Sequence, residues 1–204
     1  MKLEGAIFVL TLSIQSLLAQ TSVKESIKKD TLPYFEIGSY PKRYTAENVV
    51  ARLIDGLGFR FYWTTEGLRP EDLSFKPSSE ARTLEETIDH ILYLSELILK
   101  PLKRETIVSS GEELPKYSFE EKRKMILYNL KKASDLLLTG KVKIDKVKIV
   151  FKIKGQKSEY PFWHALNGQI EDAVWHTGQI VSFRRTSGNP FNGKANVFLG
   201  KIEK

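Results

Sequence analysis

Apolar residues recur at three- and four-residue intervals in four stretches of the chain, which is the pattern of a helix with one buried face. These stretches predict helices over about residues 45–65, 83–100, 118–139 and 161–186. In the first stretch the apolar positions are Val49, Val50, Leu53, Ile54, Leu57 and Phe61. Four long helices of this kind indicate a mainly helical protein.

Two of the predicted helices begin with a recognisable capping signal. Thr83 precedes Glu86 by three residues, and Ser118 precedes Glu121 by the same interval. In this capping box the two side chains satisfy backbone N–H groups that have no partner within the helix. Gly140 suits the end of the third helix, because glycine readily adopts the left-handed conformation that commonly follows a helix.

Between the third and fourth helices the apolar spacing changes to every second residue. Val147, Ile149, Phe151 and Ile153 alternate with polar residues, which predicts a β-hairpin over about residues 141–160. The expected fold is therefore all-α: a four-helix bundle, up-and-down or crossover, with a small β-hairpin between helices 3 and 4.

The N-terminal segment MKLEGAIFVLTLSIQSLLAQ has a different pattern, with Lys2 followed by a short apolar run and then a small residue, Ala19. This pattern predicts a signal peptide over residues 1–19, and hence export to the periplasm or secretion. Glu4 and Gln15 depart from it, so the alternative is an uncleaved segment that anchors the protein to the membrane.

The rest of the chain divides at about residue 40. Residues 20–40 are mostly polar and are expected to form a disordered leader. Residues 41–204 are expected to form one domain, because 204 residues suffice for one core and not for two large ones. The chain has no cysteine, which excludes disulfides, a cysteine nucleophile and thiolate ligands. Any metal site must therefore use histidine, carboxylate or backbone oxygen.

The net charge is +7, and much of it lies in the predicted hairpin, where residues 141–157 hold seven lysines against Asp145. We interpret these lysines as the solvated face of a strand pair. The alternative is weak contact with an anionic surface. Nucleic acid is not expected as a partner, because this segment has no arginine and few aromatic residues.

The candidate chemistry lies in the second and fourth helices. Asp172 and His176 are four residues apart, which places both side chains on one helix face about 6 Å apart. That spacing suits two ligands of one metal ion, and His90 from a facing helix would be the third ligand. The alternatives are a surface Asp–His pair, worth a few tenths of a kcal/mol, and a lone core histidine at position 90.

Two neighbouring residues refine this hypothesis. His164 precedes His176 by twelve residues, about 18 Å along a continuous helix, so it is not expected to bind the same ion. Gln179 lies just past His176 on the same face and could orient a ligand or substrate.

These residues resemble a known family. The histidine in TLEETIDHILYLSE and the motif in GQIEDAVWHTGQIVSFRR resemble the DinB/YfiT-like family of bacterial four-helix metalloproteins. The resemblance covers about residues 45–188 and implies His90, Asp172 and His176 as metal ligands, although the family most often has histidine at position 172. The fourth-helix segment also looks like a secreted branch of this family found in Bacteroidetes-type bacteria. Residues 41–204 would then be a DinB-like metal-binding domain.

The resulting function hypothesis is a divalent-metal-binding protein that acts as a hydrolase or transferase on an unknown small-molecule substrate. Zinc, nickel or iron would suit the ligand set. No catalytic residue is assigned: Glu86 and Glu171 are weak candidates for a base, and Arg184 and Arg185 for attracting an anionic substrate. The thiol-dependent activity of some family members is discounted, because export would remove the protein from abundant small thiols.

Two alternatives remain open at this point. The protein could be a non-catalytic metal- or ligand-binding module of the cell envelope, or an interaction protein that uses its lysine-rich hairpin. A homodimer that pairs through a helix face is a further hypothesis, since bundles commonly pair in this way, but the sequence does not identify the face.

Overall fold

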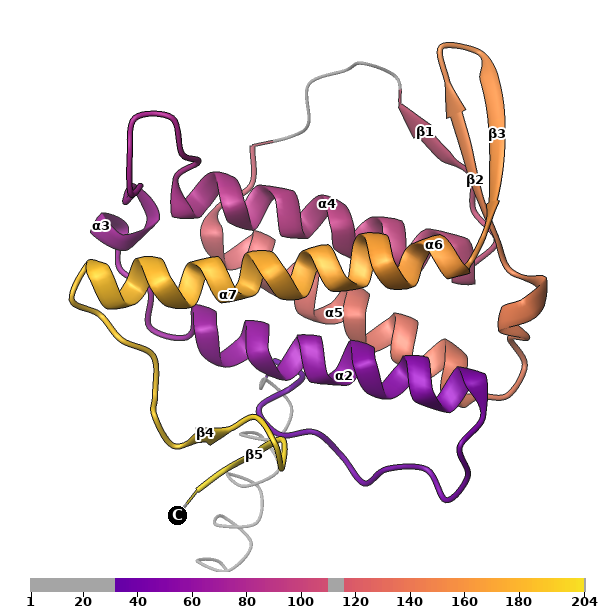
Figure 1. Ribbon diagram of the computed structural model, residues 1–204, viewed down its shortest axis with the longest axis horizontal. Coiled ribbons are helices and arrows are strands. Elements are labelled where there is room, and N and C mark those ends of the chain that lie inside the picture. The colour runs from indigo at the N-terminus through magenta and orange to yellow at the C-terminus, as the bar shows by residue number, and fades with distance from the viewer. Residues whose placement is uncertain (1–31, 110–115, 204) are drawn as a thin grey trace, which may run out of the picture. The chain divides into compact units, whose positions relative to one another are not determined.

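Four long helices form the core of the folded unit, which begins at Pro33. They are α2 (Ala46–Thr65), α4 (Leu84–Leu102), α5 (Phe119–Leu138) and α7 (Glu171–Thr186). The computed structural model describes residues 32–109 and 116–203, so the predicted signal peptide and most of the predicted leader lie outside the described residues. α5 packs against α2 and α4, and α7 lies across the same two helices (Figure 1).

The starts and inward faces of these helices follow from local sequence. The capping boxes of Thr83 with Glu86 and of Ser118 with Glu121 are confirmed at the N-termini of α4 and α5. The inward faces are aliphatic and aromatic, and their largest fully buried side chains are Ile54, Leu57, Phe59, Phe61, Leu84, Ile88, Ile91, Ile98, Ile126, Leu127, Leu130 and Leu137. Burying one side chain of this size contributes about 1.5–3 kcal/mol, so this core holds α2, α4 and α5 together, and α7, whose Ile180 is fully buried, packs on α2 and α4.

A mixed three-stranded sheet stands at one end of the helices. Its strands are β1 (Ile107–Ser109), β2 (Lys148–Ile153) and β3 (Gln156–Pro161). β2 and β3 form the antiparallel hairpin, and β1 adds to β2 in parallel, with Ile107 opposite Phe151 (Figure 1). Ile149 is buried whereas Ile153, toward the hairpin tip, is 47% exposed. The hairpin therefore joins the core only at its base.

The predicted all-α four-helix bundle with a small hairpin is therefore wrong. The hairpin belongs to a mixed three-stranded sheet, and a second pair of short strands, β4 (Ala195–Asn196) and β5 (Lys201–Ile202), follows α7. Two short helices, α3 (Pro70–Leu73) and α6 (Trp163–Ala165), add to the departure. The physical reason is that strands of two or three residues are too short to show a two-residue period, and their pairing depends on tertiary position.

The predicted fourth helix is interrupted. A π-helical turn at Leu166–Ile170 separates α6 from α7. The wider turn changes which residues share a face, so the segment is not the continuous α-helix from Pro161 that the sequence pattern predicts. Single π-helical turns inside helices frequently occur at functional sites, and this one ends two residues before Asp172.

The described part of the predicted leader is packed against the helices. The Tyr34 hydroxyl donates to Asp55 Oδ1 at 3.1 Å, and the Tyr34 ring lies where a side chain at Gly58 would stand. The Ile37 backbone N–H donates to the Gly200 carbonyl at 2.8 Å. Residues 33–37 are therefore fixed between α2 and the C-terminal strands. No helix among the described residues is both long enough and apolar enough to cross a membrane.

Candidate metal centre

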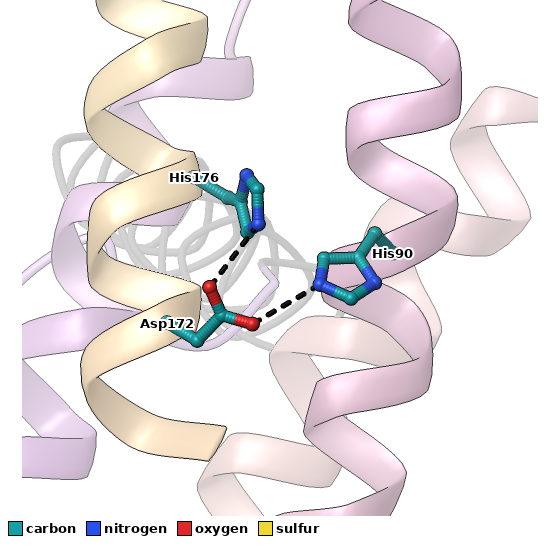
Figure 2. A group of neighbouring side chains, drawn as sticks. All are labelled: His90, Asp172 and His176. Carbon is teal, nitrogen blue, oxygen red and sulfur yellow. Dashed lines mark hydrogen bonds and ion pairs between the residues drawn. The ribbon is translucent and has the colours of Figure 1, made fainter. Parts of the chain in front are cut away.

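Side chains from two helices converge at the candidate centre. His90 lies on α4, and Asp172 and His176 lie on successive turns at the start of α7 (Figure 2). His90 Nε2 is 3.1 Å from Asp172 Oδ2, and His176 Nε2 is 3.2 Å from Asp172 Oδ1. The two imidazole rings meet edge to face with their centroids 4.6 Å apart. The structure thus brings together all three residues that the sequence suggested as ligands.

The separations within this group are compatible with one bound cation. One potential ligand atom from each residue lies within 4.8 Å of the other two. Ligands bound at about 2.0–2.2 Å from one ion stand roughly 3 Å apart, which is close to both His–Asp separations. The cluster could therefore hold a metal ion, with two imidazole nitrogens and one carboxylate oxygen as the donor set.

Gln179 orients one of the histidines. Its amide oxygen Oε1 lies 2.7 Å from His176 Nδ1 and, as an acceptor, places the ring proton on that nitrogen. With the proton on Nδ1, the lone pair of His176 Nε2 is available to bind a cation. Gln179, which the sequence suggested as a residue that could orient a ligand, is thus in direct contact with His176.

The centre is partly open to solvent. The exposed fraction is 15% for the His176 side chain, 26% for that of His90 and 36% for that of Asp172. Ions and small molecules can therefore reach the group, while the surrounding helices hold it in place. This intermediate burial is unlike that of a surface Asp–His pair, whose side chains would be free to move apart.

Other residues considered in the sequence lie away from the centre. His164 is exposed and packs its ring edge to face on Tyr160, with centroids 5.5 Å apart, so it does not join the cluster. Glu86 accepts a hydrogen bond from the Thr83 backbone N–H at 2.7 Å, which commits its carboxylate to the cap. Glu171 is exposed beside Asp172.

The hypothesis that Arg184 attracts an anionic substrate is wrong. Its side chain is buried and donates to the carbonyl oxygens of Thr64 and Glu66, both at 2.8 Å. It also donates to the carbonyl and side-chain oxygens of Asn189. Arg184 therefore satisfies carbonyl groups at the end of α2, where the last turn of a helix lacks internal partners.

Sequence reasoning missed a second polar cluster, at the C-terminal end of α7. We call it the Asp72 cluster; its members are Arg69, Asp72, Arg184, Ser187 and Asn189. Asp72 is fully buried and accepts hydrogen bonds from the Arg69 guanidinium at 2.8 and 2.9 Å, from Ser187 Oγ at 2.7 Å and from Asn189 Nδ2 at 2.6 Å. These bonds, led by those from Arg69, hold the pKa of Asp72 well below its usual range. The proline of RPED gave a local signal of helix α3, but nothing local pointed to α7.

Comparison of the chain with protein-family models, with curated proteins and with solved structures finds no match. The likeness to the DinB/YfiT-like family accordingly rests on the sequence motifs around His90 and His176.

Proposed function

We propose that the protein binds one divalent metal ion through His90, Asp172 and His176, and that it acts as a metal-dependent hydrolase or transferase on a small molecule. The observation that carries the proposal is the convergence of two imidazole Nε2 atoms on one carboxylate. Membership of the DinB/YfiT-like family is part of the same proposal. It is supported by the positions of the three residues in the sequence.

The donor set suits several first-row metals. Two imidazole nitrogens and one carboxylate oxygen resemble the ligand sets of catalytic zinc sites and of non-haem iron sites, and nickel also accepts imidazole. Asp172 stands where the family most often has histidine, so this centre carries one more negative charge than a three-histidine site. We therefore propose zinc, iron or nickel as the metal, and the carboxylate makes iron a stronger candidate than three histidines would.

Gln179, His176 and Asp172 would have different roles at this centre. Gln179 fixes the His176 ring with its proton on Nδ1, which leaves Nε2 free to bind. Asp172 supplies negative charge between the two rings and is the most exposed of the three. A divalent ion with only three protein ligands can lower the pKa of water and polarise a substrate oxygen. Solvent access at Asp172 is the route by which a small substrate would arrive.

Metal analysis tests the proposal directly. The protein is purified without a polyhistidine tag and compared with the His90→Ala, His176→Ala and His164→Ala variants. We expect about one equivalent of zinc, iron or nickel in the wild type and in His164→Ala, and a loss of more than about ten-fold in affinity in the other two. His164→Ala is the matched control, because it removes an imidazole outside the cluster. Equal metal content in all four proteins, or none on titration, would sink the proposal.

A second candidate function is a non-catalytic metal-binding module, and the position of Glu86 favours it. This acid, one turn before His90, is held by the Thr83 backbone and is not free to act as a base. Loading the protein with Mn²⁺ and measuring water proton relaxation separates the two functions. Rapidly exchanging water at the metal is expected of an enzyme, whereas a closed coordination sphere would indicate a binding module.

A further inference from the structure

A cavity of about 410 Å³ lies away from the metal centre and is lined by residues from the end of α4 and the start of β2. Its apolar wall includes Pro101, Leu102 and Val150. Pro101 follows His90 by eleven residues on α4, which is roughly 16 Å at the rise of an α-helix. The volume falls within the range of small-molecule sites, about 300–1,000 Å³.

The polar wall of this cavity is strongly cationic. Arg104, Lys143, Lys146 and Lys148 line it, with Glu105 as the single acid. Glu105 forms an ion pair with Lys103, and Asp145 forms one with Lys146 at 3.3 Å. Glu47 lies nearby and accepts a hydrogen bond from the Ile144 backbone N–H. The cationic charges come from two segments about forty residues apart, so the fold gathers them at one place.

Arg104 occupies a backbone position that favours glycine. Its φ angle is +60°, in the left-handed region. The Arg104 N–H donates to the Pro101 carbonyl and the Glu105 N–H to the Lys100 carbonyl, both at 2.9 Å, which is the Schellman arrangement that ends many helices. A side chain at this position costs free energy relative to glycine. The chain nevertheless has an arginine there, and Arg104 is one of the residues that line the cavity.

We propose that this cavity, which we call the cationic pocket, binds a small organic phosphate. A guanidinium with several ammonium groups suits a multiply charged phosphate better than a single carboxylate. The apolar wall would contact the organic part of the ligand. This site is independent of the metal centre. It would give a binding role to lysines that the sequence analysis interpreted as the solvated face of a strand pair.

Binding of inorganic pyrophosphate to the full-length protein, measured by calorimetry at fixed ionic strength, tests the pocket. The pocket variant is Lys143→Gln with Lys146→Gln, and the control is Lys152→Gln with Lys157→Gln. The two pairs are matched, because all four lysines are exposed and each pair contains one lysine in an ion pair with a neighbouring acid. We expect the pocket variant to lose at least about ten-fold in affinity and the control to change by less than about two-fold. Equal losses would overturn the proposal in favour of general attraction by the lysine-rich segment.

Arg104→Gly gives a second, independent test. Glycine removes the left-handed strain, so the variant is expected to melt at a higher temperature than the wild type, yet to bind pyrophosphate more weakly. Weaker binding by a more stable protein cannot be explained by unfolding. Unchanged pyrophosphate affinity in Arg104→Gly would contradict the proposed role of the guanidinium.

Vesicles distinguish the source of the phosphate. Phosphatidylcholine vesicles with and without phosphatidic acid are sedimented with the wild type and both lysine variants. Binding that needs phosphatidic acid and is lost in the pocket variant alone would identify a lipid headgroup as the phosphate. Pyrophosphate binding without vesicle binding would identify a soluble phosphate. Loss of neither in the pocket variant would overturn the proposal.

Discussion

Two polar clusters lie near opposite ends of α7, and they are built in opposite ways. At its C-terminal end the Asp72 carboxylate is fully buried and receives donors from Arg69, Ser187 and Asn189. Near its N-terminal end the Asp172 carboxylate is 36% exposed and faces two imidazole nitrogens, at 3.1 and 3.2 Å. Both oxygens of the Asp72 carboxylate accept hydrogen bonds from side chains of its own cluster, whereas the Asp172 group has the ligand atoms and the spacing that could hold a metal ion.

The burial and hydrogen bonding of the two clusters indicate which one is structural and which one is functional. A matched, buried network holds segments together, because breaking it leaves polar groups without partners. A partly exposed group of converging acceptors adds little to stability but can bind an ion. Substitution of Asp72 should therefore change mainly the free energy of unfolding, and substitution of Asp172 should change mainly the affinity for metal.

The largest expected effect comes from exchanging the two aspartates for asparagine, one at a time. Asp72→Asn removes the charge that Arg69 contacts and is expected to lower the free energy of unfolding by about 2–4 kcal/mol. Asp172→Asn should change it by less than about 1 kcal/mol, since the contact is partly exposed. Urea denaturation without added metal measures both values. A larger loss in Asp172→Asn than in Asp72→Asn would reverse the comparison.

Titration of metal into the same two variants tests whether their metal affinities differ in the opposite order to their stabilities. Folded Asp72→Asn protein should bind metal as the wild type does, whereas Asp172→Asn should bind it more weakly. Metal titrated at a temperature where both variants are folded gives the two dissociation constants. Metal binding lost equally in both variants would mean that the clusters are coupled through α7 and do not act separately.

Much of this arrangement could be predicted from local sequence, and the remainder depends on distant contacts. The capping boxes of α4 and α5 and the one-face spacing of Asp172 and His176 are local features, so they were readable from the residues. The Asp72 cluster joins residues that lie more than one hundred positions apart, such as Asp72 and Ser187. β1 is three residues long and has no periodicity of its own. Arg184 was expected to attract an anionic substrate, and only the packing of α7 against α2 buries it.

A smaller effect is expected from Gln179, which acts on the metal through His176. Gln179→Ala removes the acceptor for the Nδ1 proton, so the ring loses its fixed orientation and metal affinity should fall about ten- to one-hundred-fold. Gln179→Glu keeps an acceptor at this position and should retain most of the affinity. Competition with a chelator of known affinity measures both variants. Equal affinities for wild type and Gln179→Ala would show that the 2.7 Å contact does not orient the ligand.

The smallest expected effect is the pH dependence of the stability that Asp72 contributes. The folded protein holds the pKa of Asp72 below its ordinary value, chiefly through hydrogen bonds from Arg69. The stabilisation that the Asp72 charge provides is therefore complete above the pKa of this carboxyl in the unfolded chain. It is lost as the pH falls through the pKa of the same carboxyl in the folded protein. With an unfolded pKa of about 3.9, Asp72 should contribute about 1.3 kcal/mol less at pH 3 than at pH 6. The destabilisation caused by Asp72→Asn should shrink by that amount between the two pH values in urea denaturation. A destabilisation that is the same at both pH values would mean that folding does not shift the pKa of Asp72, and one that is larger at pH 3 would mean that the folded protein holds this carboxyl protonated.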